Sequence, residues 1–154
     1  MNYLMFCFYL YICRKFWCMT LRELEKSLQG VRKDTSVSYP WLSLKGLKYE
    51  TIIKIHNGKN YRLSSLFHYL DLLACVLYVN GQMAENAESL GDLLREKRIA
   101  AGLTVVDISS KLKCTQQIIY NLENGKSSSR NTLSGYISCI GDISFSIREM
   151  IDVL

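Results

Sequence analysis

The segment TQQIIYNLENGK, Thr115–Lys126, carries the clearest structural signal in this chain of 154 residues. Its apolar residues follow helical spacing, and Thr115 has a side chain suited to a helix N-cap. Gly125 suits the position just after a helix, where a left-handed conformation is common. The segment therefore predicts a helix that runs from Thr115 to about Asn124.

A second copy of this element lies earlier in the chain. Asn57-Gly58-Lys59, moved along by 67 positions, superimposes on Asn124-Gly125-Lys126. Apolar and aromatic residues on both sides superimpose as well, including Ile52 with Ile119, Leu66 with Leu133 and Tyr69 with Tyr136. The chain therefore repeats one structural unit, and its two copies are expected to share a scaffold.

Helix signals surround the later copy. A leucine repeat that begins at Leu90 predicts a helix ending at Gly102. Thr104 and Asp107 have the spacing of a capping box for the next helix. After the quoted segment, residues 127–140 form a fourth and a fifth helix, or one helix that continues.

Two helices joined by a short turn form a helix-turn-helix unit, whose second helix fits the major groove of DNA. Together with REKRIAAGLT just upstream, the quoted segment resembles the lambdoid phage repressor and Cro family of helix-turn-helix proteins over residues 89–140. This resemblance implies a bundle of five helices. The same template applied to residues 19–79 gives a divergent copy, with 80–88 as a polar linker between the two domains and 89–154 as the second domain.

A short segment of alternating character follows each copy: ACVLYV (Ala74–Val79) and DISFSI (Asp142–Ile147). Both segments are strands, or both extend the preceding helices. A subset of the family carries a strand at this place that pairs with its dimer partner. We therefore predict a mainly α fold of two tandem five-helix helix-turn-helix domains, whose strands pair with each other and make one chain a covalent pseudo-dimer.

The resemblance also implies which residues would meet DNA. The base-reading positions are Thr115, Gln116, Gln117 and Asn121 in the second copy, and Lys48, Tyr49, Glu50, Thr51 and Lys54 in the first. A Gln amide donates and accepts together at adenine N6 and N7, and a Thr methyl group contacts thymine. The competing explanation is that Gln116 and Gln117 are merely solvent-exposed residues of a helix, with no contact to DNA. The residues expected to hold phosphates are Lys126, Ser127, Ser128, Lys59, Asn60 and Arg62.

Two further features of the template concern the scaffold. The resemblance implies a buried ion pair between Arg98 and Glu123. The first copy has Arg32 opposite His56, so the pair is broken there or replaced by a weaker one. Lys113 occupies the place of the turn glycine, and it would have to adopt a left-handed conformation at some cost.

The composition argues against several other classes of protein. The six cysteines have no C-x-x-C spacing, and His56 and His68 have no obvious nucleophile beside them. No metal site, disulfide framework, cofactor motif or catalytic group is indicated, so we expect no enzyme activity. Scattered cysteines are typical of a reduced, cytoplasmic protein. The net charge of +5, concentrated in residues 20–79, is compatible with a nucleic acid partner.

The first eighteen residues, MNYLMFCFYLYICRKFWC, are apolar up to Arg14-Lys15. The apolar part is shorter than the roughly 20 residues of a membrane span, and it lacks the features of a signal peptide. Three explanations are open: a start codon placed too early, with Met19 the natural start; an extra helix or strand docked on the domain; or a membrane anchor with the remainder in the cytoplasm. The membrane anchor is the least expected of these three explanations, so we do not expect a membrane to be a partner.

The function expected from these residues is that of a sequence-specific DNA-binding transcriptional regulator, a repressor of its own or a neighbouring promoter. It would read double-stranded DNA with the third helix of each copy. The alternative is an antitoxin that neutralises a partner toxin and also binds DNA, since many antitoxins of this family use the same fold. A membrane-tethered regulator is a third possibility that rests only on residues 1–13. Beyond the pseudo-dimer within one chain, a homo-oligomer is compatible with the sequence.

Overall fold

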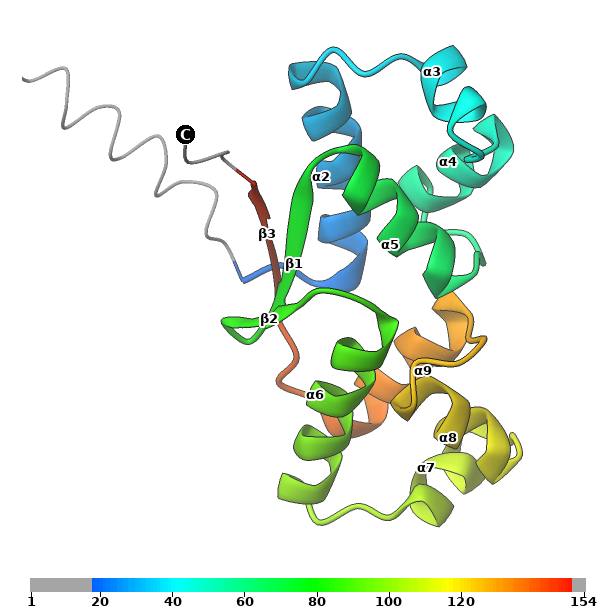
Figure 1. The fold of residues 1–154 in the computed structure, drawn as a ribbon. Coiled ribbons are helices and arrows are strands. Elements are labelled where there is room, and N and C mark those ends of the chain that lie inside the picture. Colours follow the sequence, from blue (N-terminus) through cyan, green and yellow to red (C-terminus); the bar gives the residue numbers. More distant parts are fainter. Residues whose placement is uncertain (1–17, 151–154) are drawn as a thin grey trace, which may run out of the picture.

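The computed structural model describes residues 18–150, which are mainly helical with one small antiparallel sheet (Figure 1). The helices are α2 (Leu21–Asp34), α3 (Tyr39–Leu44), α4 (Tyr49–His56), α5 (Leu63–Leu72), α6 (Ala87–Ala100), α7 (Val105–Leu112), α8 (Gln116–Glu123) and α9 (Arg130–Ile140). The strands are β1 (Cys75–Val79), β2 (Gln82–Ala84) and β3 (Phe145–Glu149), in the sheet order β2-β1-β3. The predicted mainly α class with short strands is confirmed.

The helices form two groups, α2–α5 and α6–α9, which lie above and below each other in Figure 1 with the sheet beside them. We predicted five helices in each group, but the described part of the chain has four in each. The Ser129 side chain accepts a hydrogen bond from the backbone N–H of Thr132 at 3.3 Å, and α9, which it caps, continues unbroken to Ile140. The residues that we assigned to a fourth and a fifth helix therefore belong to one.

The two groups match closely along the chain. α2 and α6 have 14 residues each and begin with capping boxes, at Thr20 and Asn86. α4 and α8 have 8 residues each, whereas α3 has 6 and α7 has 8. In the turn before α4 and α8, Gly46 (φ 88°) and Lys113 (φ 51°) occupy equivalent left-handed positions. Lys113 thus takes the conformation of the missing turn glycine, as expected.

β1 and β3 pair with each other in antiparallel register, with Leu77 opposite Ile147 at the centre. The two strands therefore pair within one chain, as we predicted. β3 begins at Phe145 instead of at the predicted Asp142. Gly141 and Asp142 both have positive φ angles (70° and 47°) and turn the chain after α9. Phe145 and Ile147 are the buried side chains of this strand.

Residues 80–88, which we expected to be a linker, contain the strand β2. Asn80 and Gly81 have φ angles of 48° and 81°, and β1 and β2 pair across this two-residue turn. An Asn-Gly dipeptide is a strong sequence signal for such a hairpin. Asn86 then caps α6, so the helix begins at Ala87, before residue 89, where we placed the start of the second domain.

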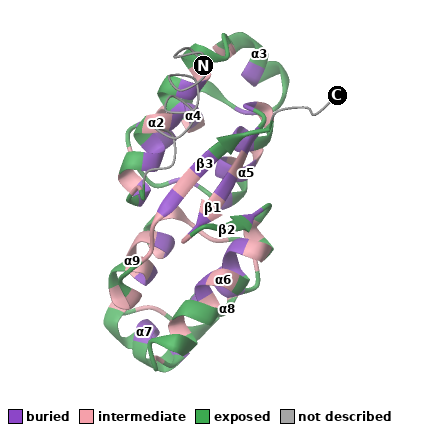
Figure 2. Ribbon diagram, turned by 90° about the vertical axis from the view of Figure 1, so that its left-hand side faces the viewer, coloured by how far each residue is buried: buried purple, intermediate pink, exposed green. Residues whose placement is uncertain are grey.

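One hydrophobic core runs through both groups of helices and the sheet. Fully buried residues at matching positions are Leu24 and Leu90, Leu28 and Leu94, Ile52 and Ile119, Ile55 and Leu122, and Leu66 and Leu133. Leu77 of β1 and Phe145 of β3 continue the core, and Figure 2 shows buried residues along these strands. Because β1 follows the first group and β3 the second, apolar burial joins the two copies.

Residues 1–17 and 151–154 lie outside the described part of the chain, so the three explanations for the apolar N-terminal segment are untested. Met19 enters the fold beside β3, where its backbone exchanges hydrogen bonds of 2.8 and 2.7 Å with that of Phe145. Within residues 18–150, no helix combines the length and the apolar character needed to cross a membrane.

Candidate nucleic-acid interface

Two backbone hydrogen bonds join the helical groups at equivalent positions. The N–H of Leu63 donates to the carbonyl of Ser128 at 3.0 Å, and the N–H of Arg130 donates to the carbonyl of Tyr61 at 2.8 Å. The two donors are 67 positions apart, and so are the two acceptors, as in the contacts of a two-fold symmetric dimer. An approximate two-fold axis therefore passes through this bridge.

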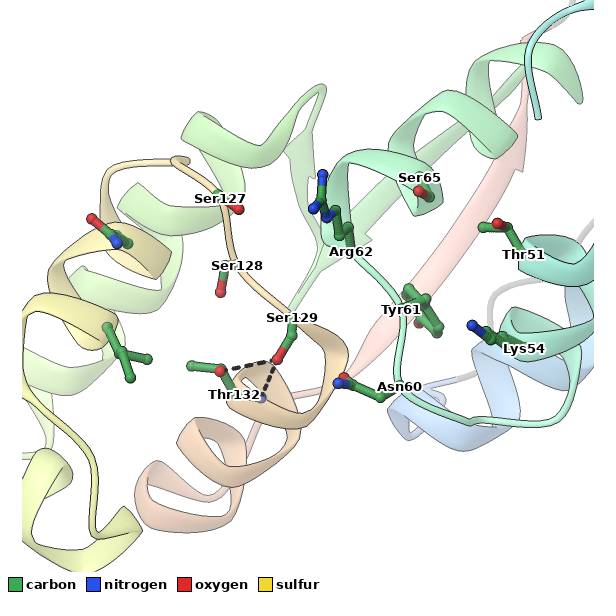
Figure 3. A pocket seen from close by; sticks show the side chains of 12 residues that line it. Thr51, Lys54, Asn60, Tyr61, Arg62, Ser65, Ser127, Ser128, Ser129 and Thr132 are labelled. Atoms are coloured by element: carbon green, nitrogen blue, oxygen red, sulfur yellow. Dashed lines mark hydrogen bonds between the residues drawn. The ribbon is translucent and has the colours of Figure 1, made fainter. Parts of the chain in front are cut away.

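A cleft of about 580 Å³ lies on this axis between α4 and α8 (Figure 3). Six residues of its lining come from the first copy, and the other six are their counterparts in the second. The pairs are Thr51 and Ile118, Lys54 and Asn121, Asn60 and Ser127, Tyr61 and Ser128, Arg62 and Ser129, and Ser65 and Thr132. All of these except Ile118 carry a polar side-chain group, so the cleft suits a polar or charged ligand.

The residues predicted to read bases in the second copy lie along the first two turns of α8. Gln116 and Gln117 are exposed, and the Thr115 N-cap side chain makes no capping hydrogen bond. Asn121 lines the cleft and accepts a hydrogen bond from Nε2 of Gln117 at 2.9 Å. The structure therefore brings these four predicted residues together at one helix.

The equivalent part of α4 carries different side chains. Lys48, Glu50 and Lys54 are exposed, and Thr51 and Lys54 line the cleft. Tyr49 packs edge-to-face against a tyrosine of α3, with ring centroids 4.9 Å apart, and is still 52% exposed. The two copies thus present unlike chemical groups from equivalent helices.

Four of the six residues predicted to hold phosphates line the cleft, while Lys59 and Lys126 are exposed just beyond the ends of α4 and α8. Asn60 is tied to the second copy, since its Oδ1 accepts a hydrogen bond from the N–H of Asn131 at 3.2 Å. The Ser128 hydroxyl oxygen is buried and has no hydrogen-bond partner within residues 18–150. This hydroxyl is therefore not presented to a phosphate, unlike the two exposed lysines.

The lining residues without a predicted contact to DNA include Ser65, Ile118, Ser129 and Thr132. Their only sequence signal was the repeat, because Ser65 matches Thr132 and Arg62 matches Ser129 in the superposition by 67 positions. Only an axis between the two copies brings such counterparts to one place.

Arg98 and Glu123, which we expected to pair, do so beneath the end of α8. Nε and Nη2 of Arg98 donate to the two carboxylate oxygens of Glu123 at 2.6 and 3.0 Å, and the Tyr136 hydroxyl donates to Oε1 at 2.5 Å. Arg95, which we did not predict, adds an N–H to Oε2 at 3.4 Å. Burial works to raise the pKa of Glu123, but the hydrogen bonds from Arg98 and Tyr136 outweigh it and lower that pKa. The ionised carboxylate holds the last turn of α8 against α6.

Within residues 18–150, the corresponding place in the first copy has no ion pair. His56 Nε2 is 2.9 Å from the Tyr69 hydroxyl, which corresponds to the Tyr136 hydroxyl of the second copy. Among the described residues, Nδ1 of His56 and Nε of Arg32 are buried without a hydrogen-bond partner. Burial, and then the charge of Arg32, lower the pKa of His56 to about 4, so the ring is neutral at pH 7. As expected, the ion pair is broken in the first copy, and the two nitrogens named above have no hydrogen-bond partner among the described residues.

Replacing His56 by glutamate is expected to raise the free energy of unfolding by about 1.5–3 kcal/mol, the usual contribution of a hydrogen bond to a charged group. The new carboxylate would meet the Arg32 guanidinium and the Tyr69 hydroxyl, as Glu123 meets its partners in the second copy. Urea unfolding at pH 7 measures the change. The control is the same substitution in an Arg32→Met background, where the gain must vanish; a gain that persists there contradicts the explanation.

No group of His, Cys, Asp and Glu side chains within residues 18–150 has an arrangement that could hold a metal ion. No protein-family model matches the chain, and searches of the curated proteins and of the solved structures find no match. The fold and the cleft therefore carry the functional argument.

Proposed function

We propose that this protein is a DNA-binding transcriptional regulator, a repressor, that reads one double-stranded site with α4 and α8 together. Each group of four helices is then a helix-turn-helix domain, with α3–α4 and α7–α8 as the two motifs. The observation that carries the proposal is the symmetric cleft, which lies between two equivalent helices and is lined by residues from both copies. Two helices related by a two-fold axis are suited to half-sites about one turn of DNA apart.

The two reading faces support different roles. The α8 face carries exposed Gln116 and Gln117 beside Asn121, and amides of this kind bond adenine in the major groove. The α4 face is basic, since Lys54 and Arg62 line its side of the cleft. Its contribution is mainly electrostatic attraction to phosphates. The DNA site is therefore two unlike half-sites, and the one under α4 tolerates more sequence variation.

Gln116→Ala combined with Gln117→Ala is expected to abolish the preference for the bases under α8 while binding to non-specific DNA persists. A good bidentate contact contributes about 1–3 kcal/mol of discrimination, so the preferred site should lose about tenfold or more of its advantage. Selection of bound sites from random DNA by the unaltered protein first defines the site. Titration of that site and of a scrambled one, at one stated salt concentration, then measures the loss.

Two controls accompany this experiment. Gln82→Ala removes an exposed glutamine from β2, which lies on the left in Figure 1 while α4 and α8 lie on the right, and should change nothing. Lys126→Ala should weaken binding to both DNAs alike and reduce the salt slope by about one. Wild-type preference in the double glutamine variant would disprove the readout assignment. An unaltered protein that prefers no sequence would disprove the proposed function.

A further inference from the structure

One buried ion pair crosses from the first helical group to the second. Glu25 of α2 is fully buried, and Arg130 at the start of α9 donates from Nε and Nη2 to its two oxygens at 2.8 and 3.2 Å. The Tyr61 hydroxyl donates to the same carboxylate at 2.8 Å. The carbonyl of Tyr61 in turn accepts the N–H of Arg130 at 2.8 Å. These three residues therefore form a closed ring of interactions between the copies.

This ring lies between the supports of α4 and α8. The Glu25 carboxylate lies directly beside the turn that ends α4, since a Cβ on Gly58 would be 2.7 Å from its Oε2. Arg130 is the first residue of α9, which packs against α8. The ion pair therefore connects the end of α4 to the helix that supports α8.

The pair has no symmetry mate. When α2 is matched to α6 and α5 to α9, the positions equivalent to Glu25 and Arg130 are Gly91 and Leu63, which carry no charge. The β1–β3 pairing and the two-bond backbone bridge, by contrast, contribute equivalent residues from both copies. Paired strands tolerate a range of twist, whereas a bidentate Arg–carboxylate pair has a fixed geometry. The asymmetric pair is therefore the contact best suited to fix the angle between the copies.

From this placement we infer that Glu25 and Arg130 are positioning residues that set the separation and angle of α4 and α8, and thereby the half-site spacing that the protein accepts. The inference rests on the proposed function. One added base pair moves a half-site by about 3.4 Å and rotates it by about 35°. A rigid pair of helices accepts few spacings, and a loosened pair accepts several.

The test compares the full chain with the double variant Glu25→Gln/Arg130→Met. Glutamine keeps an acceptor for the Tyr61 hydroxyl and methionine fills the space of the arginine stem, so no charge is stranded in the interior. Neither residue is among those assigned to DNA contact. Val31→Ala is the control for lost stability, because it removes buried methyl groups from α2 and leaves the ion pair intact.

The first measurement uses DNA that carries the two half-sites selected by the unaltered protein, with the spacer changed one base pair at a time. At one salt concentration, the unaltered protein and Val31→Ala should lose about tenfold or more in affinity one base pair from the best spacing, a loss comparable with that for a mismatched base pair. The double variant should lose less than about threefold over the same step, because its helices adjust to the new spacing. A folded double variant that keeps the wild-type spacing profile overturns the inference and leaves the proposed function standing.

A second measurement needs no DNA. Spin labels attached through non-cysteine groups introduced at Lys59 and Lys126, the equivalent exposed lysines that follow α4 and α8, report the distance between the copies. One narrow distance distribution is expected with the ion pair present, and a broader one in the double variant. An unchanged distribution overturns the inference. If the unaltered protein selects no two-part site, the proposed function fails and the spacing inference fails with it.

Discussion

Glu123→Ala is expected to lower the free energy of unfolding by about 3–5 kcal/mol, a large part of the stability of a small protein. The substitution leaves the Arg98 guanidinium, whose side chain is only 11% exposed, without the carboxylate that binds it at two points. The Tyr136 hydroxyl loses its short hydrogen bond as well. Because Glu123 is the last residue of α8, the end of the proposed reading helix also loses its attachment to α6. Urea unfolding at pH 7, followed by circular dichroism, measures the loss.

Two controls separate the stranded charge from the lost packing. Arg98→Met combined with Glu123→Leu replaces the pair with apolar side chains of similar volume, which often costs little. The Tyr136 hydroxyl keeps its second acceptor, the Leu94 carbonyl at 3.2 Å. Glu96→Ala removes an exposed carboxylate from α6 and should change stability by less than about 0.5 kcal/mol. Equal losses in the single and the double variant would contradict the explanation by an unpaired buried charge.

Gly125→Ala is expected to lower the free energy of unfolding by about 2–5 kcal/mol, by two additive effects. The residue has a φ of +65°, which any side chain makes unfavourable. A Cβ at this position would also overlap the backbone N and Cα of Glu88, and these atoms move only if α6 moves. The glycine of the repeated Asn-Gly-Lys sequence is therefore needed for helix contact as well as for chain direction. Thermal unfolding and proteolysis both detect the loss.

Gly102→Ala is the matched control for this substitution. Gly102 has a φ of +69°, and no other atom of residues 18–150 lies within 4 Å of the place where its Cβ would be. Its replacement should cost only the backbone part, about 1–2 kcal/mol. A loss at Gly125 no larger than that at Gly102 would show that the close approach to α6 is relieved by relaxation.

Helix positions were predictable where a few neighbouring residues define an end. Thr104 with Asp107, and Gly125 after the quoted segment, marked helix ends that the structure contains. At 127–140 the sequence left one helix or two open, because several serines suggested helix starts, and the chain uses only Ser129. Several residues had the right side chain for a cap, and only the packing of the last helix selects one of them.

The candidate site was predictable in part. Thr115, Gln116, Gln117 and Asn121 were identified from the resemblance, and the structure places them together on α8. The cleft was not predicted, because Ser65 and Thr132 meet only when the two copies are set around an axis. Nothing in either copy alone indicates which of its faces turns toward the other.

The repeat, its caps and its alternating strands follow from the order of residues along the chain, since these patterns depend on neighbours a few positions apart. The placement of one copy against the other depends on contacts between distant positions. Glu25 and Arg130 are 105 residues apart, and the local partner of Glu25, Arg22 three residues earlier at 3.6 Å, does not indicate the distant one. Such a pair forms only after α2 and α9 have been brought together by the core and the strands. The helices α4 and α8 were thus predictable from the sequence, and their relative geometry arises from the packing of the complete fold.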